Sequence, residues 1–252
     1  MNTGDVDALC AALAPLPRHN ADTALFRAAQ FNQAFFIKPL VERCSADVNA
    51  VDPRNDETAL HSAACAGSSE TAVALLDAGA DYSKKNKNNS TALTVACSML
   101  VMQGLGEYHR LKAEKMITAL VEKAGYVHSR SAWTEATPLS LVASTGNAPM
   151  VKLLLAAGAP VNAPAKVPFY KREGDAPTGF WSPLHAAAER GDKAMIELLL
   201  AAGADPNGRD GKGRTPLHYA HKHENGCYGA LLDAGAKNNA YDSSGKFPDQ
   251  YY

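Results

Sequence analysis

The stretch SPLHAAAERGDKAMIELLLAAGAD, residues 182–205, contains two apolar segments, and a glycine follows each of them. Ser182 can cap a helix, because its hydroxyl accepts a hydrogen bond from a backbone N–H that has no partner within the helix. Pro183 suits the first helical position, where no N–H is required. Gly191 and Gly203 can adopt the left-handed conformation that ends a helix. The stretch therefore predicts two short helices joined by a turn.

Related stretches recur along the chain. The first motif begins at residues 23, 58, 91, 137, 182 and 215, so that successive starts lie 35, 33, 46, 45 and 33 residues apart. An apolar second motif, such as LLDAGAD or LLLAAGAP, follows each start. One pair of short helices cannot bury its apolar faces, whereas stacked copies bury a continuous core. The sequence therefore predicts a stack of 33-residue units, with 2, 13 and 12 residues added at three places.

The 33-residue period and the motifs SPLHAA at 182 and TPLHYA at 215 resemble the ankyrin repeat. The resemblance implies an all-α solenoid of stacked helix-turn-helix units, with β-like finger loops between successive repeats. It also implies a concave surface, formed by the fingers and the first helices, that usually binds a protein. His61, His185 and His218 match the histidine of the family, which hydrogen-bonds within and between repeats.

The resemblance covers residues 23 to about 250, so we expect a single ankyrin-repeat domain over residues 1–252. Apolar residues at helical spacing near the N-terminus predict a capping helix within residues 1–22, and Pro15 would end it. Residues 241–252 look like a repeat start cut short, and we expect them to form a C-terminal cap.

Some repeats depart from the pattern. Phe26 in repeat one and Thr94 in repeat three occupy the position of the histidine. Asn32 in repeat one and Glu224 in the last repeat stand where a helix-ending glycine is expected. We expect these departures to change the ends of helices and to leave the fold intact.

Two insertions interrupt the repeats. Residues 97–115 lie between the helices of repeat three, where the apolar spacing predicts two lengthened helices that meet as a projecting hairpin. This extension either packs on itself or offers a surface to a partner. Residues 163–181 lengthen a finger loop and contain four aromatic residues. This loop either anchors a partner, folds back over the stack or is disordered.

Exposed aromatic side chains that cluster on fingers are the usual anchors of a protein interface. The long finger and the preceding finger, residues 126–137, contain both tryptophans of the chain. First-helix residues such as Ser62, Cys65 and Tyr219 would add specificity. We therefore expect the partner to contact Tyr126, Trp133, Phe169, Tyr170, Phe180 and Trp181, with the cations Arg130, Lys171 and Arg172 beside them.

The composition argues against several classes of protein. A net charge of −1 produces no overall field that would draw the chain to nucleic acid or to an anionic membrane. No window approaches the roughly eighteen apolar residues of a membrane span. Five cysteines, an odd number without a CxxC pair, argue against a disulfide framework. Asp5 and Asp7 interrupt the N-terminal apolar stretch, so we expect no signal peptide, a cytoplasmic location and, as an open alternative, leaderless export.

No phosphate loop, GxSxG or HExxH motif occurs in the chain. His221 and His223 would point about 200° apart on a helix, so they cannot share one metal ion with Cys227. We therefore expect no enzyme and no cofactor. The sequence predicts a scaffold that is monomeric when free and binds a protein partner. The alanine-rich repeats also resemble those of bacterial ankyrin proteins, and this resemblance implies a bacterial effector or a neutralising partner. Two alternatives stay open: an enzyme or ligand-binding protein with residues 163–181 as a lid, and a structural homo-oligomer.

Overall fold

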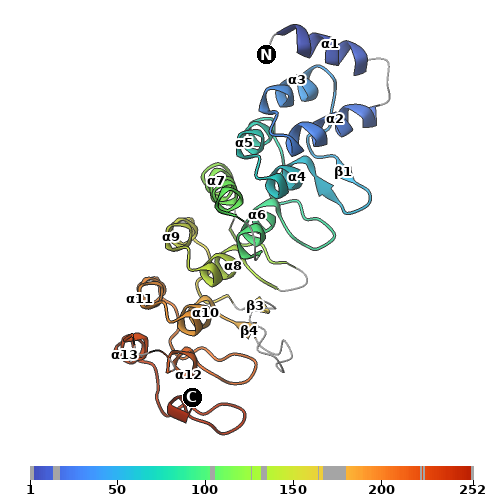
Figure 1. Ribbon diagram of the computed structural model, residues 1–252. Helices are drawn as coiled ribbons and strands as arrows, with labels where there is room; N and C mark the ends of the chain where they lie inside the picture. The colour runs from blue at the N-terminus through green and yellow to red at the C-terminus, as the bar shows by residue number, and fades with distance from the viewer. Residues whose placement is uncertain are drawn as a thin grey trace. The chain divides into compact units, whose positions relative to one another are not determined.

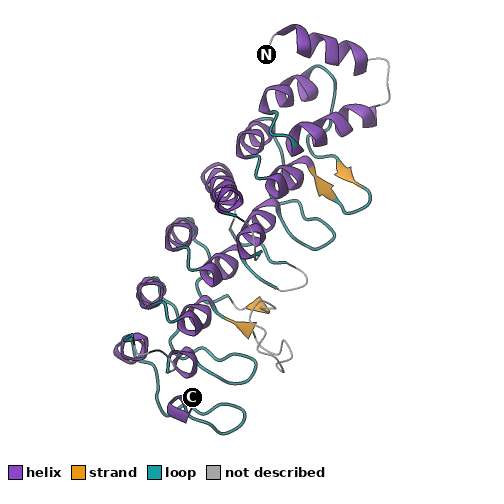
Figure 2. Ribbon diagram, in the orientation of Figure 1, coloured by secondary structure: helices purple, strands orange, loops and turns teal. Residues whose placement is uncertain are grey.

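The computed structural model describes residues 3–13, 18–102, 106–125, 127–131, 135–163, 165–166, 180–221, 223 and 225–250. Contacts group the chain into two compact units, Met1–Ser129 (unit 1) and Arg130–Tyr252 (unit 2). Within each unit, short helices form pairs, and successive first helices lie side by side, as do successive second helices (Figures 1 and 2). The predicted stack of helix pairs is therefore confirmed in each unit, while the single domain expected over the whole chain stays a prediction.

Unit 1 contains the elements before residue 130. Its first helices are α2 (Arg18–Gln30), α4 (Ala59–Ala66) and α6 (Ala92–Val101). Its second helices are α3 (Ile37–Glu42), α5 (Ser69–Asp77) and α7 (Glu107–Ala124). The predicted capping helix α1 (Thr3–Leu13) packs on α3, and the short helix η1 (Ala34–Phe36) precedes α3. The antiparallel hairpin β1 (Val51–Asp52) and β2 (Glu57–Thr58), which pairs Val51 with Thr58, precedes α4.

Unit 2 repeats this pattern. Its first helices are α8 (Pro138–Thr145), α10 (Pro183–Arg190) and α12 (Pro216–Ala220). Its second helices are α9 (Ala148–Ala156), α11 (Lys193–Ala201) and α13 (Cys227–Asp233), and η2 (Pro248–Gln250) lies at the C-terminal end. The hairpin β3 (Ala165–Lys166) and β4 (Phe180–Trp181), which pairs Ala165 with Trp181, precedes α10.

The predicted histidine caps connect neighbouring repeats. The Nδ1 atom of His61 accepts a hydrogen bond from the backbone N–H of Thr58 at 3.2 Å. The opposite nitrogen, Nε2, lies 2.9 Å from the carbonyl oxygen of Ser90 in the next finger, so one neutral ring caps a helix and links two repeats. The same arrangement joins Ser182 and His185 to Arg214, and Thr215 and His218 to Lys246.

Hydroxyl groups replace the histidine in repeat three. The Oγ atom of Ser129 lies 2.6 Å from Thr94 Oγ1 and accepts a hydrogen bond from Thr91 Oγ1 at 2.9 Å. All three side chains are buried. The departure at Thr94 therefore keeps both the helix cap and the link to the following finger.

Left-handed glycines end α4, α7, α8 and α10, whereas α6 ends at Val101 and α12 at Ala220 without one. Glu224, where the last repeat departs from the pattern, lies outside the described residues. Repeat one shows two changes. Asn32 takes the place of glycine by adopting a positive φ of 54°. Helix α2 begins at Arg18, five residues before the predicted start at Thr23, whose hydroxyl instead donates to the carbonyl oxygen of His19 at 2.8 Å. The helical motif in repeat one therefore extends farther toward the N-terminus than its sequence predicts.

The N-terminal cap contains an unexpected covalent link. Cys10 in α1 and Cys44 after α3 form a disulfide, with their Cα atoms 5.6 Å apart. Val6 of α1 is buried, and Arg43 pairs with Asp7 of α1 at 2.6 Å. The sequence favours unpaired cysteines, and the difference arises because folding brings together two residues that are 34 positions apart.

The insertion in repeat three forms the predicted lengthened helices on either side of residues 103–105, which lie outside the described residues. Helix α7 has 18 residues, twice the 9 residues of α5. Its C-terminal part is buried through Met116, Ile117 and Leu120, whereas Tyr108 and Leu111 near its start are exposed. The extension therefore buries small side chains such as Cys97 and Ala113 and leaves its large apolar side chains Met102, Tyr108 and Leu111 exposed.

Candidate binding groove

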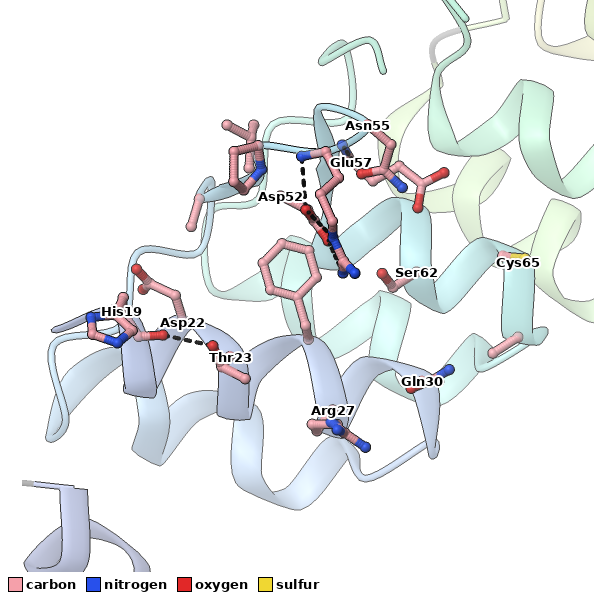
Figure 3. A pocket seen from close by; sticks show the side chains of 16 residues that line it. His19, Asp22, Thr23, Arg27, Gln30, Asp52, Asn55, Glu57, Ser62 and Cys65 are labelled. Atoms are coloured by element: carbon pink, nitrogen blue, oxygen red, sulfur yellow. Dashed lines mark hydrogen bonds and ion pairs between the residues drawn. The ribbon is translucent and has the colours of Figure 1, made fainter. Parts of the chain in front are cut away.

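A groove with a volume of about 820 Å³ lies in unit 1 between α2, α4 and the β1–β2 hairpin (Figure 3). The first helices form its floor and one wall, and the hairpin forms the other wall. Its position therefore matches the finger-and-helix surface that the sequence predicts as the binding side.

The floor of the groove follows from the way the first helices pack. In α4, Leu60, Ala63 and Ala64 are buried in the core, which leaves Ser62 and Cys65 on the side that lines the groove. In α2, Phe26 stands where other repeats have the buried histidine, and its half-buried ring also lines the groove. The floor therefore combines an apolar ring with small polar groups.

The rim is formed by a charged pair on the hairpin. The Nη2 and Nε atoms of Arg54 lie 2.7 and 3.0 Å from the two carboxylate oxygens of Asp52. This side-chain hydrogen bond lowers the pKa of Asp52 to about 2. The Arg54 side chain nevertheless stays 87% exposed, so its guanidinium is oriented and still accessible from solvent.

The neighbouring finger holds the hairpin in place. The backbone N–H of Lys87 donates to the carbonyl oxygen of Asn55 at 2.9 Å. Its side-chain Nζ atom donates to the carbonyl oxygens of Pro53 and Arg54 at 3.0 and 2.8 Å. These bonds fix the hairpin before any partner arrives, so the groove is preformed.

Cys65 is the exposed cysteine that lines this groove. Partial burial, followed by the negative charge of Glu57, raises the pKa of its thiol. The thiol therefore stays protonated at neutral pH, which suits a surface contact better than a nucleophile.

The residues predicted from the long finger are only partly described. Trp181 is half-buried in β4, and its ring centroid lies 4.6 Å from that of Tyr219. Phe180 pairs with Lys166 through the backbone, and Arg130 is exposed. The remaining predicted contacts lie outside the described residues: Tyr126, Trp133, Phe169, Tyr170, Lys171 and Arg172.

The prediction that Tyr219 lies on the surface of the first helix is wrong. It is only 7% exposed, and its hydroxyl donates to the buried carboxylate of Asp210. Arg214 completes this network, with Nε at 3.0 Å from Asp210 and its guanidinium 4.7 Å from the centre of the Tyr219 ring. The network fixes a finger of unit 2, and Trp181 packs against it.

The sequence did not indicate that the β1–β2 hairpin would form a wall of the groove. The prediction favoured the long finger because of its aromatic residues, whereas Phe26 is the one Phe, Tyr or Trp residue that lines the groove. One feature of the sequence could have indicated the groove. Phe26 occupies the position of the histidine in repeat one, and a phenylalanine there changes the surface of the first repeat.

The described residues contain no group of three or more His, Cys, Asp and Glu side chains that could hold a metal ion. In the suspected group, Cys227 is buried, the ring of His221 lies 5.5 Å from that of Tyr228, and His223 bonds to the carbonyl oxygen of Glu189. In the part of the chain that the structure describes, no helix has the length and apolar character needed to cross a membrane.

Comparison with known families gives one consistent match. A family model of ankyrin repeats matches residues 2–86, 25–104 and 165–242, and a model of the single ankyrin repeat matches residues 134–166. A putative palmitoyltransferase of Danio rerio, ZDHHC13, is 32% identical over 113 residues. That match covers 43% of this chain and 18% of the relative, so the chain spans less than a fifth of its length.

Two solved structures share the fold. The crystal structure of the human ASB11 ankyrin repeat domain has a TM-score of 0.62 and 23% sequence identity, and the match covers 89% of each chain. The ankyrin repeat domain of Bcl-3, described as a member of the IkappaB family, has a TM-score of 0.67 and 21% identity over 89% of this chain and 91% of that chain. At these identities the likeness shows the fold alone.

Proposed function

This chain belongs to the ankyrin repeat family, and from this premise we propose that it is a non-catalytic scaffold that binds a protein partner through the groove of unit 1. The family is generally used for protein–protein interaction. The preformed groove, with Phe26 on its floor and Arg54 on its rim, is the observation that carries the proposal. A rigid site of this kind avoids much of the entropy cost of ordering a loop on binding.

The chemistry of the groove defines the partner segment. An apolar side chain of the partner would cover the ring of Phe26, and a carboxylate would accept hydrogen bonds from the exposed guanidinium of Arg54. In unit 2, Trp181, Phe180 and Arg130 remain proposed contacts, together with the predicted residues outside the described part of the chain.

The test compares partner capture by matched variants. Phe26→Ala combined with Arg54→Glu should reduce capture of a specific partner, identified by mass spectrometry, by at least about tenfold, because both types of contact are lost. Lys152→Glu serves as the control. It also replaces an exposed cation by an anion, but on α9, and it should leave capture unchanged. Retained capture by the groove variant, with an unchanged melting curve, would exclude this groove as the site.

A further inference from the structure

Exposed apolar side chains gather on a second surface of unit 1. Of the nine exposed large apolar side chains among the described residues, five lie where a first helix turns into its second helix. They form two groups, the phenylalanine cluster (Phe31 and Phe35) and the tyrosine cluster (Met102, Tyr108 and Leu111). Scattered exposed apolar residues are normal, but a concentration on one edge indicates an interaction surface.

The two clusters belong to one continuous edge, here called the turn edge. Next to Phe31, the Nδ2 atom of Asn32 donates to Glu70 Oε2 at 2.6 Å and so joins the first turn to the start of α5. A Cβ atom on Gly67 would lie 2.8 Å from Lys112 Cβ, so the second turn lies directly against α7. Helices α5 and α7 lie side by side in Figure 1. The Nζ atom of Lys112 lies 4.8 Å from the centre of the Tyr108 ring, which completes the path to the tyrosine cluster.

The charges along the turn edge follow a particular order. Arg27, which also lines the groove, lies one helical turn before the phenylalanine cluster, and Glu107 begins α7 beside the tyrosine cluster. Between the clusters lie Glu70 and then Lys112, with Lys115 one turn farther along α7. The order is therefore cation, apolar, anion, cation, apolar, anion, and reading it backwards exchanges every cation with an anion.

Other charges close to the clusters cancel locally. Lys38 pairs with Glu42 next to the phenylalanine cluster, and Arg110 pairs with Glu114 on α7, each at 3.8 Å. The order of the remaining charges therefore sets the electrostatic character of the edge.

We propose that the turn edge of unit 1 binds a second copy of this chain around a two-fold axis. Such an axis places the phenylalanine cluster of one copy on the tyrosine cluster of the other, and sets Glu70 opposite Lys112 twice. A surface that is complementary to itself after a two-fold rotation is the requirement for an isologous dimer. Helix α4 separates this edge from the β1–β2 hairpin by its own length, eight residues or about 12 Å, so the hairpin wall of the groove stays uncovered.

Charge exchange gives the sharpest test. Sedimentation velocity of the full chain over a concentration series should show a dimer for the wild type. Glu70→Lys and Lys112→Glu should each weaken self-association at least about tenfold, because like charges then face each other twice. An equimolar mixture of the two variants should form a heterodimer as stable as the wild-type dimer, since Lys faces Glu at both positions again. Recovery in the mixture cannot arise from misfolding of either variant.

Apolar substitutions provide a second measurement. Phe31→Ser and Tyr108→Ser should each weaken the dimer at least about tenfold. Tyr241→Ser removes a similarly exposed ring from a finger of unit 2 and should leave the dimer unchanged. A wild type that is monomeric at every concentration would overturn the proposal, as would a charge-exchanged mixture that associates no better than its components. The proposal and the monomer expected from the sequence exclude each other, so the same experiment decides between them.

Discussion

His185 shows how a single side chain connects local sequence to stacking. Its ring accepts a hydrogen bond from the backbone N–H of Ser182 through Nδ1, and its Nε2 atom lies 3.1 Å from the carbonyl oxygen of Arg214. Only a neutral ring can accept at one nitrogen and donate from the other. Burial lowers the pKa of His185 to about 4, which keeps the ring neutral in the folded protein.

Acid should therefore destabilise the protein through His185. The folded-state pKa lies below the ordinary value of 6.5, so the unfolded chain binds the proton first as the pH falls. The free energy of unfolding therefore carries no penalty from His185 above pH 6.5. It decreases as the pH falls from 6.5 toward 4, by up to about 3 kcal/mol in total.

Urea unfolding at several pH values checks this expectation. The difference in free energy of unfolding between wild type and His185→Gln should narrow between pH 7.5 and pH 4.5, because the amide of the variant does not titrate. A difference that stays constant over this range would show that the ring is not held neutral.

At the scale of the elements, the sequence predicts those features that arise from neighbouring residues. The capping residue, the proline and the leucine spacing of α10 lie within a few positions of one another, so the helix pair can be predicted from one stretch. The pairing of Cys10 with Cys44 and the stacking of Trp181 on Tyr219 join residues that are 34 and 38 positions apart. Such contacts depend on the angles between helices, which a repeat motif does not encode.

The sequence predicts the type of surface that forms the groove, but it does not predict where along the chain the groove lies. The family pattern predicts that fingers and first helices form a concave side, and the groove lies there. Its location at the first hairpin depends on Phe26 and on the way Lys87 holds the carbonyl oxygens of Pro53 and Arg54. Phe26 can be seen in the sequence, but the contacts of Lys87 cannot, because the lysine contacts a segment 33 to 34 residues earlier in the chain.

We expect the attachment of α1 to depend strongly on the disulfide between Cys10 and Cys44. Cys10→Ser should lower the free energy of unfolding by up to about 4 kcal/mol without reductant, since the bond restricts the unfolded chain over 34 residues. The exposed pair of Arg43 and Asp7 contributes at most about 1 kcal/mol and cannot replace it.

Urea unfolding of wild type and Cys10→Ser, with and without dithiothreitol, measures this contribution. With dithiothreitol present, the unfolding curves of wild type and Cys10→Ser should coincide, because the disulfide is then absent from both proteins. Equal stability without reductant would mean that the bond does not contribute.

At the scale of the whole molecule, each repeat is stabilised by its neighbours. Helix α4 packs against α2, α5 and α6, and α10 packs against α8, α11 and α12. By contrast, α1 packs mainly on α3, and η2 mainly on α12. Stability should therefore be highest in the interior of each unit and lowest at these two terminal elements.

Hydrogen exchange followed by mass spectrometry can measure this distribution. Amide groups in α4 and α10 should exchange slowest, and those in α1 and η2 fastest, because a terminal element opens by breaking one interface while an interior helix must break several. Dithiothreitol should accelerate exchange in α1 and leave η2 unchanged, since the disulfide joins α1 alone to its neighbour. Uniform exchange rates from α1 through α7 would instead mean that unit 1 unfolds as a single cooperative block, and the stability of a repeat would then not depend on its place in the stack.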